Sequence, residues 1–99
     1  MDEQLTVETF VPWLARESQK WARMTANGGK PGPYLWSVAV DALNWLRHAA
    51  PDEREKALQA VKQCLDTGTT GAVTMPSDQH EADCFITLLR FVYAPPPVL

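Results

Sequence analysis

One stretch constrains the fold of this chain more than any other, and it covers residues 33–50, PYLWSVAVDALNWLRHAA. Read as an α-helix at about 100° per residue, it is apolar over most of its circumference. Its polar side chains fall mainly on one strip with the spacing of a single helix face, namely Ser37, Asp41, Asn44 and His48. Because a widely apolar helix needs other elements around it, we expect this helix to be the largely buried centre of an all-α domain.

Three further helices are predicted from apolar periodicity and from their start signals. Thr6 is a suitable N-cap for the first helix of the chain. Pro51 opens the third, with carboxylates in the first turn where the helix dipole favours them. Ser77, followed by acidic residues, marks the start of the fourth. The prediction is a compact all-α four-helix domain with helices at about 6–26, 33–49, 51–65 and 78–93.

The chain reads as one domain, residues 1–94, followed by an extended proline-rich tail, residues 95–99. Its 99 residues are close to the common size of a single domain. The longest irregular stretch, residues 66–76, is an ordinary connection or a functional surface. Within it, residues 72–74 have an extended character, but the sequence offers this segment no partner strand.

Charge and composition narrow the function classes. The chain has 12 Asp and Glu against 9 Lys and Arg, for a net charge of −3, which disfavours a nucleic-acid partner. We expect no membrane partner, because no apolar run approaches the roughly 18–20 residues of a membrane span. The N-terminus has no signal-peptide pattern, so the expected location is cytoplasmic. Cys64 and Cys84 fall near apolar helix positions and are interpreted as buried thiols.

No constellation in the sequence supports catalysis. Asp41 and His48 lie two helical turns apart, about 10 Å along the axis, which is too far for an acid–base dyad. No serine occurs in a G-x-S-x-G motif. We therefore expect a protein that is not an enzyme and that carries no cofactor.

One pair of side chains has the spacing of metal ligands. His80 and Cys84 lie at i and i+4 on the fourth helix, but a zinc site needs three or four protein ligands. A composite site of His48, Cys64, His80 and Cys84 would supply four ligands, but these residues lack the usual C-x₂₋₄-C or H-x₃₋₅-H spacing. No metal site is predicted, although a ligand- or metal-binding helical domain remains the alternative function. It would use His80 and Cys84, or a groove along the strip Ser37, Asp41, Asn44 and His48.

Two surfaces are candidates for binding a partner. The first is a basic stripe on the first helix with a tryptophan beside it, and it comprises Trp13, Arg16, Lys20, Arg23 and, beyond the helix, Lys30. Tryptophan and arginine are enriched at interface hot spots. The second surface is formed by Tyr93 and Phe91, next to the proline tail.

Together these features favour a small non-enzymatic protein that docks on a larger protein or complex as an inhibitor, adaptor or regulator. Phage anti-defence proteins, such as anti-CRISPR-type inhibitors, and immunity proteins are of this physical type. A third interpretation is nucleic-acid binding through the Arg16, Lys20 and Arg23 face. Self-association is a further expectation, since the wide apolar face of the fourth helix exceeds what one small domain needs to bury.

Overall fold

The computed structural model describes residues 5–26, 32–71 and 73–95, with residues 32–36 described through their helical backbone. The described residues form four helices and one very short hairpin, which confirms the all-α four-helix prediction. In chain order the elements are α1 (Val7–Ala26), α2 (Gly32–His48), α3 (Pro51–Thr67), β1 (Thr69–Thr70), β2 (Val73–Thr74) and α4 (Gln79–Tyr93).

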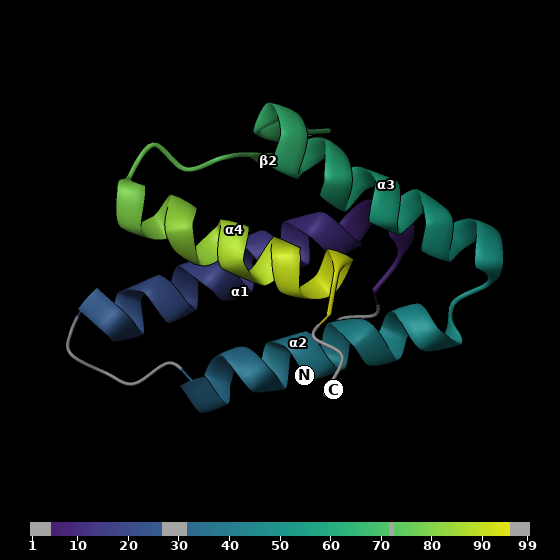
Figure 1. Cartoon of the computed structure of the whole chain (residues 1–99), viewed down its shortest axis with the longest axis horizontal. Helices are drawn as coiled ribbons and strands as arrows, with labels where there is room; N and C mark the ends of the chain where they lie inside the picture. The colour runs from purple at the N-terminus through teal and green to yellow at the C-terminus, as the bar shows by residue number, and fades with distance from the viewer. Residues whose placement is uncertain (1–4, 27–31, 72, 96–99) are drawn as a thin grey trace.

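Helix α4 is the element that organises the packing. It crosses the middle of the molecule between α3 and α2, with α1 behind it (Figure 1), and it contacts all three of these helices. Its buried side carries a wide apolar face that includes Phe85, Leu88 and Leu89. Phe10 and Leu14 of α1 are fully buried in the same core cluster, and the Phe10 ring stacks on Trp45 of α2 with 4.9 Å between the ring centroids. The expected wide apolar face of the fourth helix is thus the centre of the core.

The predicted central role of the second helix is wrong. Helix α2 lies at the edge of the molecule (Figure 1) and buries one face, formed by Val38, Ala39, Ala42 and Leu46. Val40, in contrast, is exposed on the opposite face. The width of an apolar stripe reports how much apolar surface a helix carries, but not how many helices surround it. Two alanines on the buried face let α2 approach α1 and α4 closely from one side.

The four predicted helix starts lie within one residue of those observed, and the start of α3 at Pro51 is exact. The Thr6 and Thr9 side chains cap α1 reciprocally: Thr9 Oγ1 accepts from the Thr6 amide at 2.8 Å, and Thr6 Oγ1 accepts from the Thr9 amide at 3.2 Å. The cap of α4 is Asp78 rather than Ser77, because the Asp78 carboxylate accepts from the Glu81 amide at 3.0 Å. Both caps satisfy amides that the first turn of a helix leaves unpaired.

The stretch after α3 contains the partner strand that the sequence did not indicate. Gly68 ends α3 in the left-handed conformation (φ 80°), and the chain then folds into an antiparallel pair, with Thr69 opposite Thr74 and Thr70 opposite Val73. The Met75 amide donates to the Gly68 carbonyl at 2.7 Å, which closes the hairpin. Val73 and Thr74 therefore have a partner, which is supplied by the first residues of the same connection, while residue 72 lies outside the described residues.

The α2–α3 corner is closed by one arginine. Arg54 Nε donates to the Leu46 carbonyl at 2.8 Å, while its Nη2 lies 3.4 Å from the Arg47 carbonyl and 3.3 Å from the Ala49 carbonyl. The guanidinium thus satisfies carbonyls at the C-terminal end of α2 from the first turn of α3.

Two further expectations concern the ends and the environment of the chain. Pro95, the first residue of the predicted tail at 95–99, is exposed, and the rest of the tail lies outside the described residues. None of the helices in the described segments is long and apolar enough to cross a membrane.

Candidate functional site

The predicted polar strip on α2 is exposed but does not form one groove. Ser37, Asp41, Asn44 and His48 are all exposed. Asn44 lines a shallow depression of about 220 Å³, whereas His48 lines a different hollow of about 300 Å³ near Glu53. His48 Nδ1 donates to the Asn44 carbonyl at 2.9 Å, because a carbonyl oxygen can only accept. The strip is therefore divided between two surfaces.

The predicted basic stripe lies on the outward side of α1, but parts of it are engaged within the chain. Arg16, Lys20 and Arg23 are exposed, and Lys20 Nζ pairs with Glu17 at 3.1 Å. Trp13 is partly buried and packs against the core. Lys30 lies outside the described residues. Nucleic-acid binding through this stripe stays a prediction, with one of its cations already facing a carboxylate.

His80 and Cys84 both interact with Thr25 of α1, but His80 is exposed and Cys84 is buried. His80 Nε2 lies 2.6 Å from Thr25 Oγ1 and 3.3 Å from the Ala22 carbonyl, so it links the first turn of α4 to the last turns of α1. Cys84 is buried, and this burial raises its thiol pKa, with the charge of Asp83 adding to the effect. Within the described ranges, no group of three or more His, Cys, Asp or Glu residues is placed to hold a metal ion.

Cys64 of α3 is also a buried thiol with a raised pKa. Its thiol is free and fully buried, and burial raises its pKa. The interpretation of both cysteines as buried thiols is confirmed. A raised pKa keeps a thiol protonated at neutral pH and unreactive, because the thiolate is the nucleophilic form.

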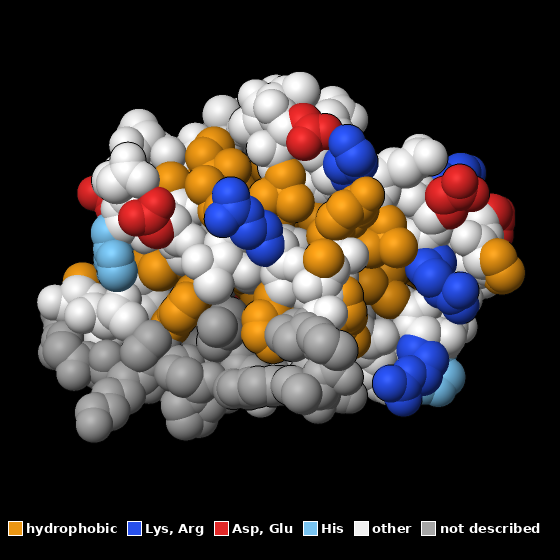
Figure 2. Space-filling view, in the orientation of Figure 1, with side chains coloured by type: hydrophobic (Ala, Val, Ile, Leu, Met, Phe, Trp, Pro, Cys, Tyr) orange, Lys and Arg blue, Asp and Glu red, His pale blue; other side chains and the backbone are white. Residues whose placement is uncertain are grey.

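Partly exposed apolar side chains line the seam between α3 and α4. We define this α3–α4 face by Leu65, Met75, Ile86 and Tyr93, together with the cations Lys62 and Arg90. Ile86, Arg90 and Tyr93 follow the i, i+4, i+7 spacing of one side of α4. Tyr93 is 41% exposed. Figure 2 shows hydrophobic side chains gathered over α4 and its boundary with α3, with basic groups interspersed among them.

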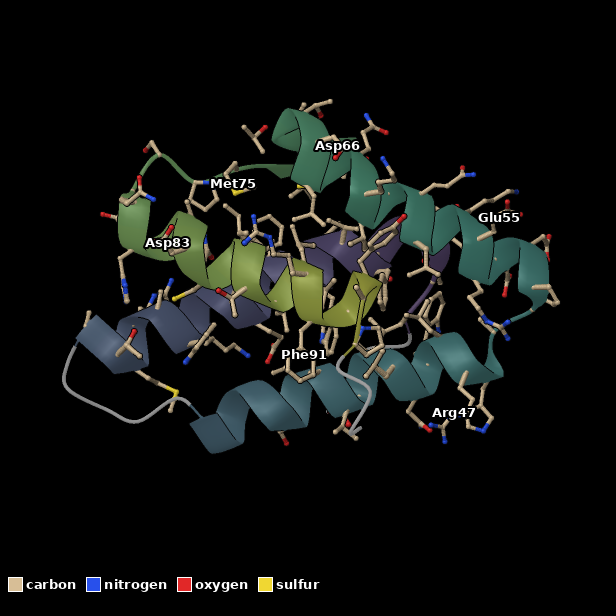
Figure 3. All side chains as sticks on the ribbon, in the orientation of Figure 1. Arg47, Glu55, Asp66, Met75, Asp83 and Phe91 are labelled. Atoms are coloured by element: carbon tan, nitrogen blue, oxygen red, sulfur yellow. The ribbon has the colours of Figure 1, made fainter. Side chains whose placement is uncertain are left out.

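An ion pair within α3 lies at this face. Lys62 Nζ pairs with the Asp66 carboxylate at 2.7 Å, and this hydrogen bond is the main reason why the pKa of Lys62 is raised. Tyr93 is close enough to contribute to the same shift. Phe91, paired with Tyr93 in the predicted second surface, is partly buried and packs against the core (Figure 3). The two aromatic residues therefore have different roles, and Tyr93 alone belongs to the exposed face.

An apolar hollow of about 280 Å³, which was not predicted from the sequence, lies on another side of the molecule. Its walls come from α1, α3 and the hairpin, and they include Val7, Val11, Pro12, Ala60 and Val73. These residues are far apart in sequence, and no periodicity within a single helix indicates that they meet. Only the tertiary packing of α1 against α3 and β2 creates this hollow.

Comparison with known proteins found no match for this chain. No protein-family model matches the chain, and neither a curated protein nor a solved structure matches it.

Proposed function

We propose that this chain is a non-enzymatic interaction protein that docks on a larger protein through the α3–α4 face. The observation that carries the proposal is Tyr93, an aromatic side chain that is 41% exposed at the end of the Ile86–Arg90–Tyr93 stripe. Tyrosine and arginine are two of the three residue types most enriched at interface hot spots. An inhibitor, an adaptor and a regulator would each use such a face in the same way.

The face also indicates the chemistry of its partner. Its apolar seam takes apolar anchor side chains, and Arg90 favours a carboxylate at the edge of the contact, whereas Lys62 is already paired with Asp66 of its own chain. The predicted α1 stripe is a weaker site, because Trp13 packs against the core of its own chain. The proposed docking site therefore corresponds to the second predicted surface and not to the first, with Tyr93 as its exposed aromatic residue.

Affinity capture with two matched pairs of variants tests the proposal. The full tagged chain is used to capture partners from a lysate of its native cells, and the affinity of the main partner is then measured with purified components. Tyr93→Ala and Arg90→Glu are each expected to weaken binding by roughly thirtyfold, the effect of losing about 2 kcal/mol at a hot spot.

The controls change similar side chains on other faces. Met24→Ala removes another exposed hydrophobic side chain, on α1, and Lys56→Glu makes a matched charge reversal on α3 away from the seam. Both are expected to bind like the wild type. The proposal is wrong if no stoichiometric partner is recovered, or if the control variants weaken binding as much as the α3–α4 variants do.

A further inference from the structure

A hollow of about 300 Å³ lies where the chain enters α1 beside the α2–α3 corner. Its walls are Leu5 and Thr6 before α1, Trp45, His48 and Ala49 at the end of α2, and Glu53 in the first turn of α3. Trp45, His48 and Ala49 have the i, i+3, i+4 spacing of one side of a helix. A volume at the lower limit of small-molecule pockets suits a single side chain better than a larger ligand.

The side chains of this hollow offer hydrogen-bond acceptors. His48 Nδ1 donates to the Asn44 carbonyl, so Nε2 of the neutral imidazole carries a lone pair and accepts. The Glu53 carboxylate only accepts, and no ion pair between described residues engages it. Trp45 Nε1 already donates to the Leu5 carbonyl at 3.1 Å, so the indole contributes its ring carbons to the hollow.

Acceptors beside an aromatic ring are complementary to a guanidinium group. Arginine presents five N–H donors in a planar fork that fits a carboxylate with two parallel hydrogen bonds, and its plane stacks on aromatic rings. A carboxylate or phosphate ligand, in contrast, would be repelled by Glu53. The cations nearest in sequence are directed elsewhere, since Arg54 Nε donates to the Leu46 carbonyl and Arg47 lines a separate depression.

We propose that this hollow receives an arginine side chain of a partner protein. The guanidinium donates to the Glu53 carboxylate and to His48 Nε2. Phe10 stacks on one face of the Trp45 indole, so the guanidinium packs against the ring surface that lines the hollow. The site does not depend on the proposed docking function, because it shares no residue with the α3–α4 face.

A nuclear magnetic resonance titration of the full ¹⁵N-labelled chain tests the proposal with a minimal probe. The probe is arginine with both backbone ends blocked, N-acetyl-argininamide, added at constant ionic strength and about pH 8, where histidine side chains are ordinarily neutral. Backbone amides around Trp45, His48 and Glu53 should shift saturably, with a Kd of about 1–10 mM for a single side chain.

Two further ligands identify the chemistry that is recognised. N-acetyl-citrullinamide keeps the shape of the probe without its charge and should bind at least about tenfold more weakly. Free arginine should bind no more tightly than the blocked probe, because only the side chain enters the hollow. Equal binding of the citrulline compound would overturn the proposal, and tighter binding of free arginine would overturn the assignment to a side chain of a partner protein.

A matched pair of variants tests whether the hollow is the site. Glu53→Gln removes the charge while keeping the shape and should weaken binding of the probe by about fivefold or more. Glu55→Gln makes the same change on the side of α3 that faces away from α2 (Figure 3) and should leave the affinity unchanged. Both side chains are exposed, and circular dichroism checks the helical content of each variant. The absence of a saturable shift in the wild type, or equal affinities of the two variants, would overturn the proposal.

Discussion

At the scale of single residues, Arg54 shows how much one side chain contributes to this fold. It contacts the Leu46, Arg47 and Ala49 carbonyls and thereby fixes the angle between α2 and α3. Periodicity places Arg54 among the solvated residues of its helix, and its contacts lie on another helix. The sequence therefore carried no signal for this role. The cap at Thr6 was readable because its partner Thr9 lies within one turn, and Pro51 was readable because proline suits the first position of a helix.

Replacement of Arg54 tests its structural role. Arg54→Met keeps most of the aliphatic stem but leaves the three carbonyls without their donor. The free energy of unfolding is expected to fall by about 2 kcal/mol, in the range for hydrogen bonds to charged groups. Urea denaturation measures the effect, and Lys56→Met on the exposed side of the same helix should change it by less than about 0.5 kcal/mol. Equal effects of the two substitutions would contradict the role of Arg54.

At the scale of helices, the residues at which each helix begins and ends were predictable from the sequence, but which elements pack against one another was not. Gly68, Pro51 and the acidic first turn of α4 indicate starts and ends through local backbone chemistry. The place of α2 at the edge, and of α4 at the centre, depends on how four apolar faces share one core. The hairpin was missed for a similar reason, because two strands of two residues each are too short to show an alternating pattern.

Helix α1 contains an internal proline, and its effect on the free energy of unfolding can be measured. Pro12 is the sixth residue of α1, so it lacks the N–H that would donate to the Glu8 carbonyl. Pro12→Ala is expected to raise the free energy of unfolding by about 1–2 kcal/mol, measured by urea denaturation. Pro51→Ala is the matched control, because Pro51 opens α3 at a position that favours proline, and it should bring no gain. A loss of stability in Pro12→Ala would show that the ring packs into the hollow beside it.

At the scale of the whole molecule, the apolar side chains are distributed over several faces. The α3–α4 face carries Tyr93 and the outward side of α2 carries Val40, while an open apolar hollow is lined by α1, α3 and the hairpin. Tyr93 was identifiable from sequence as the last aromatic residue of an apolar helix. Lys62 and Met75, which belong to the same face, were not identifiable from sequence, because they come from α3 and from the connection after the hairpin.

Photo-crosslinking from Tyr93 tests docking through the α3–α4 face most directly. Tyr93 is replaced by a photoreactive benzoylphenylalanine in the full chain, and Met24 is replaced in a matched control. After irradiation in a lysate of the native cells, we expect one discrete adduct with a larger protein from position 93, suppressed by excess unlabelled wild-type chain. Position 24 should give no such adduct. An adduct from position 24 alone, or the same adduct from both positions, would contradict docking through the α3–α4 face.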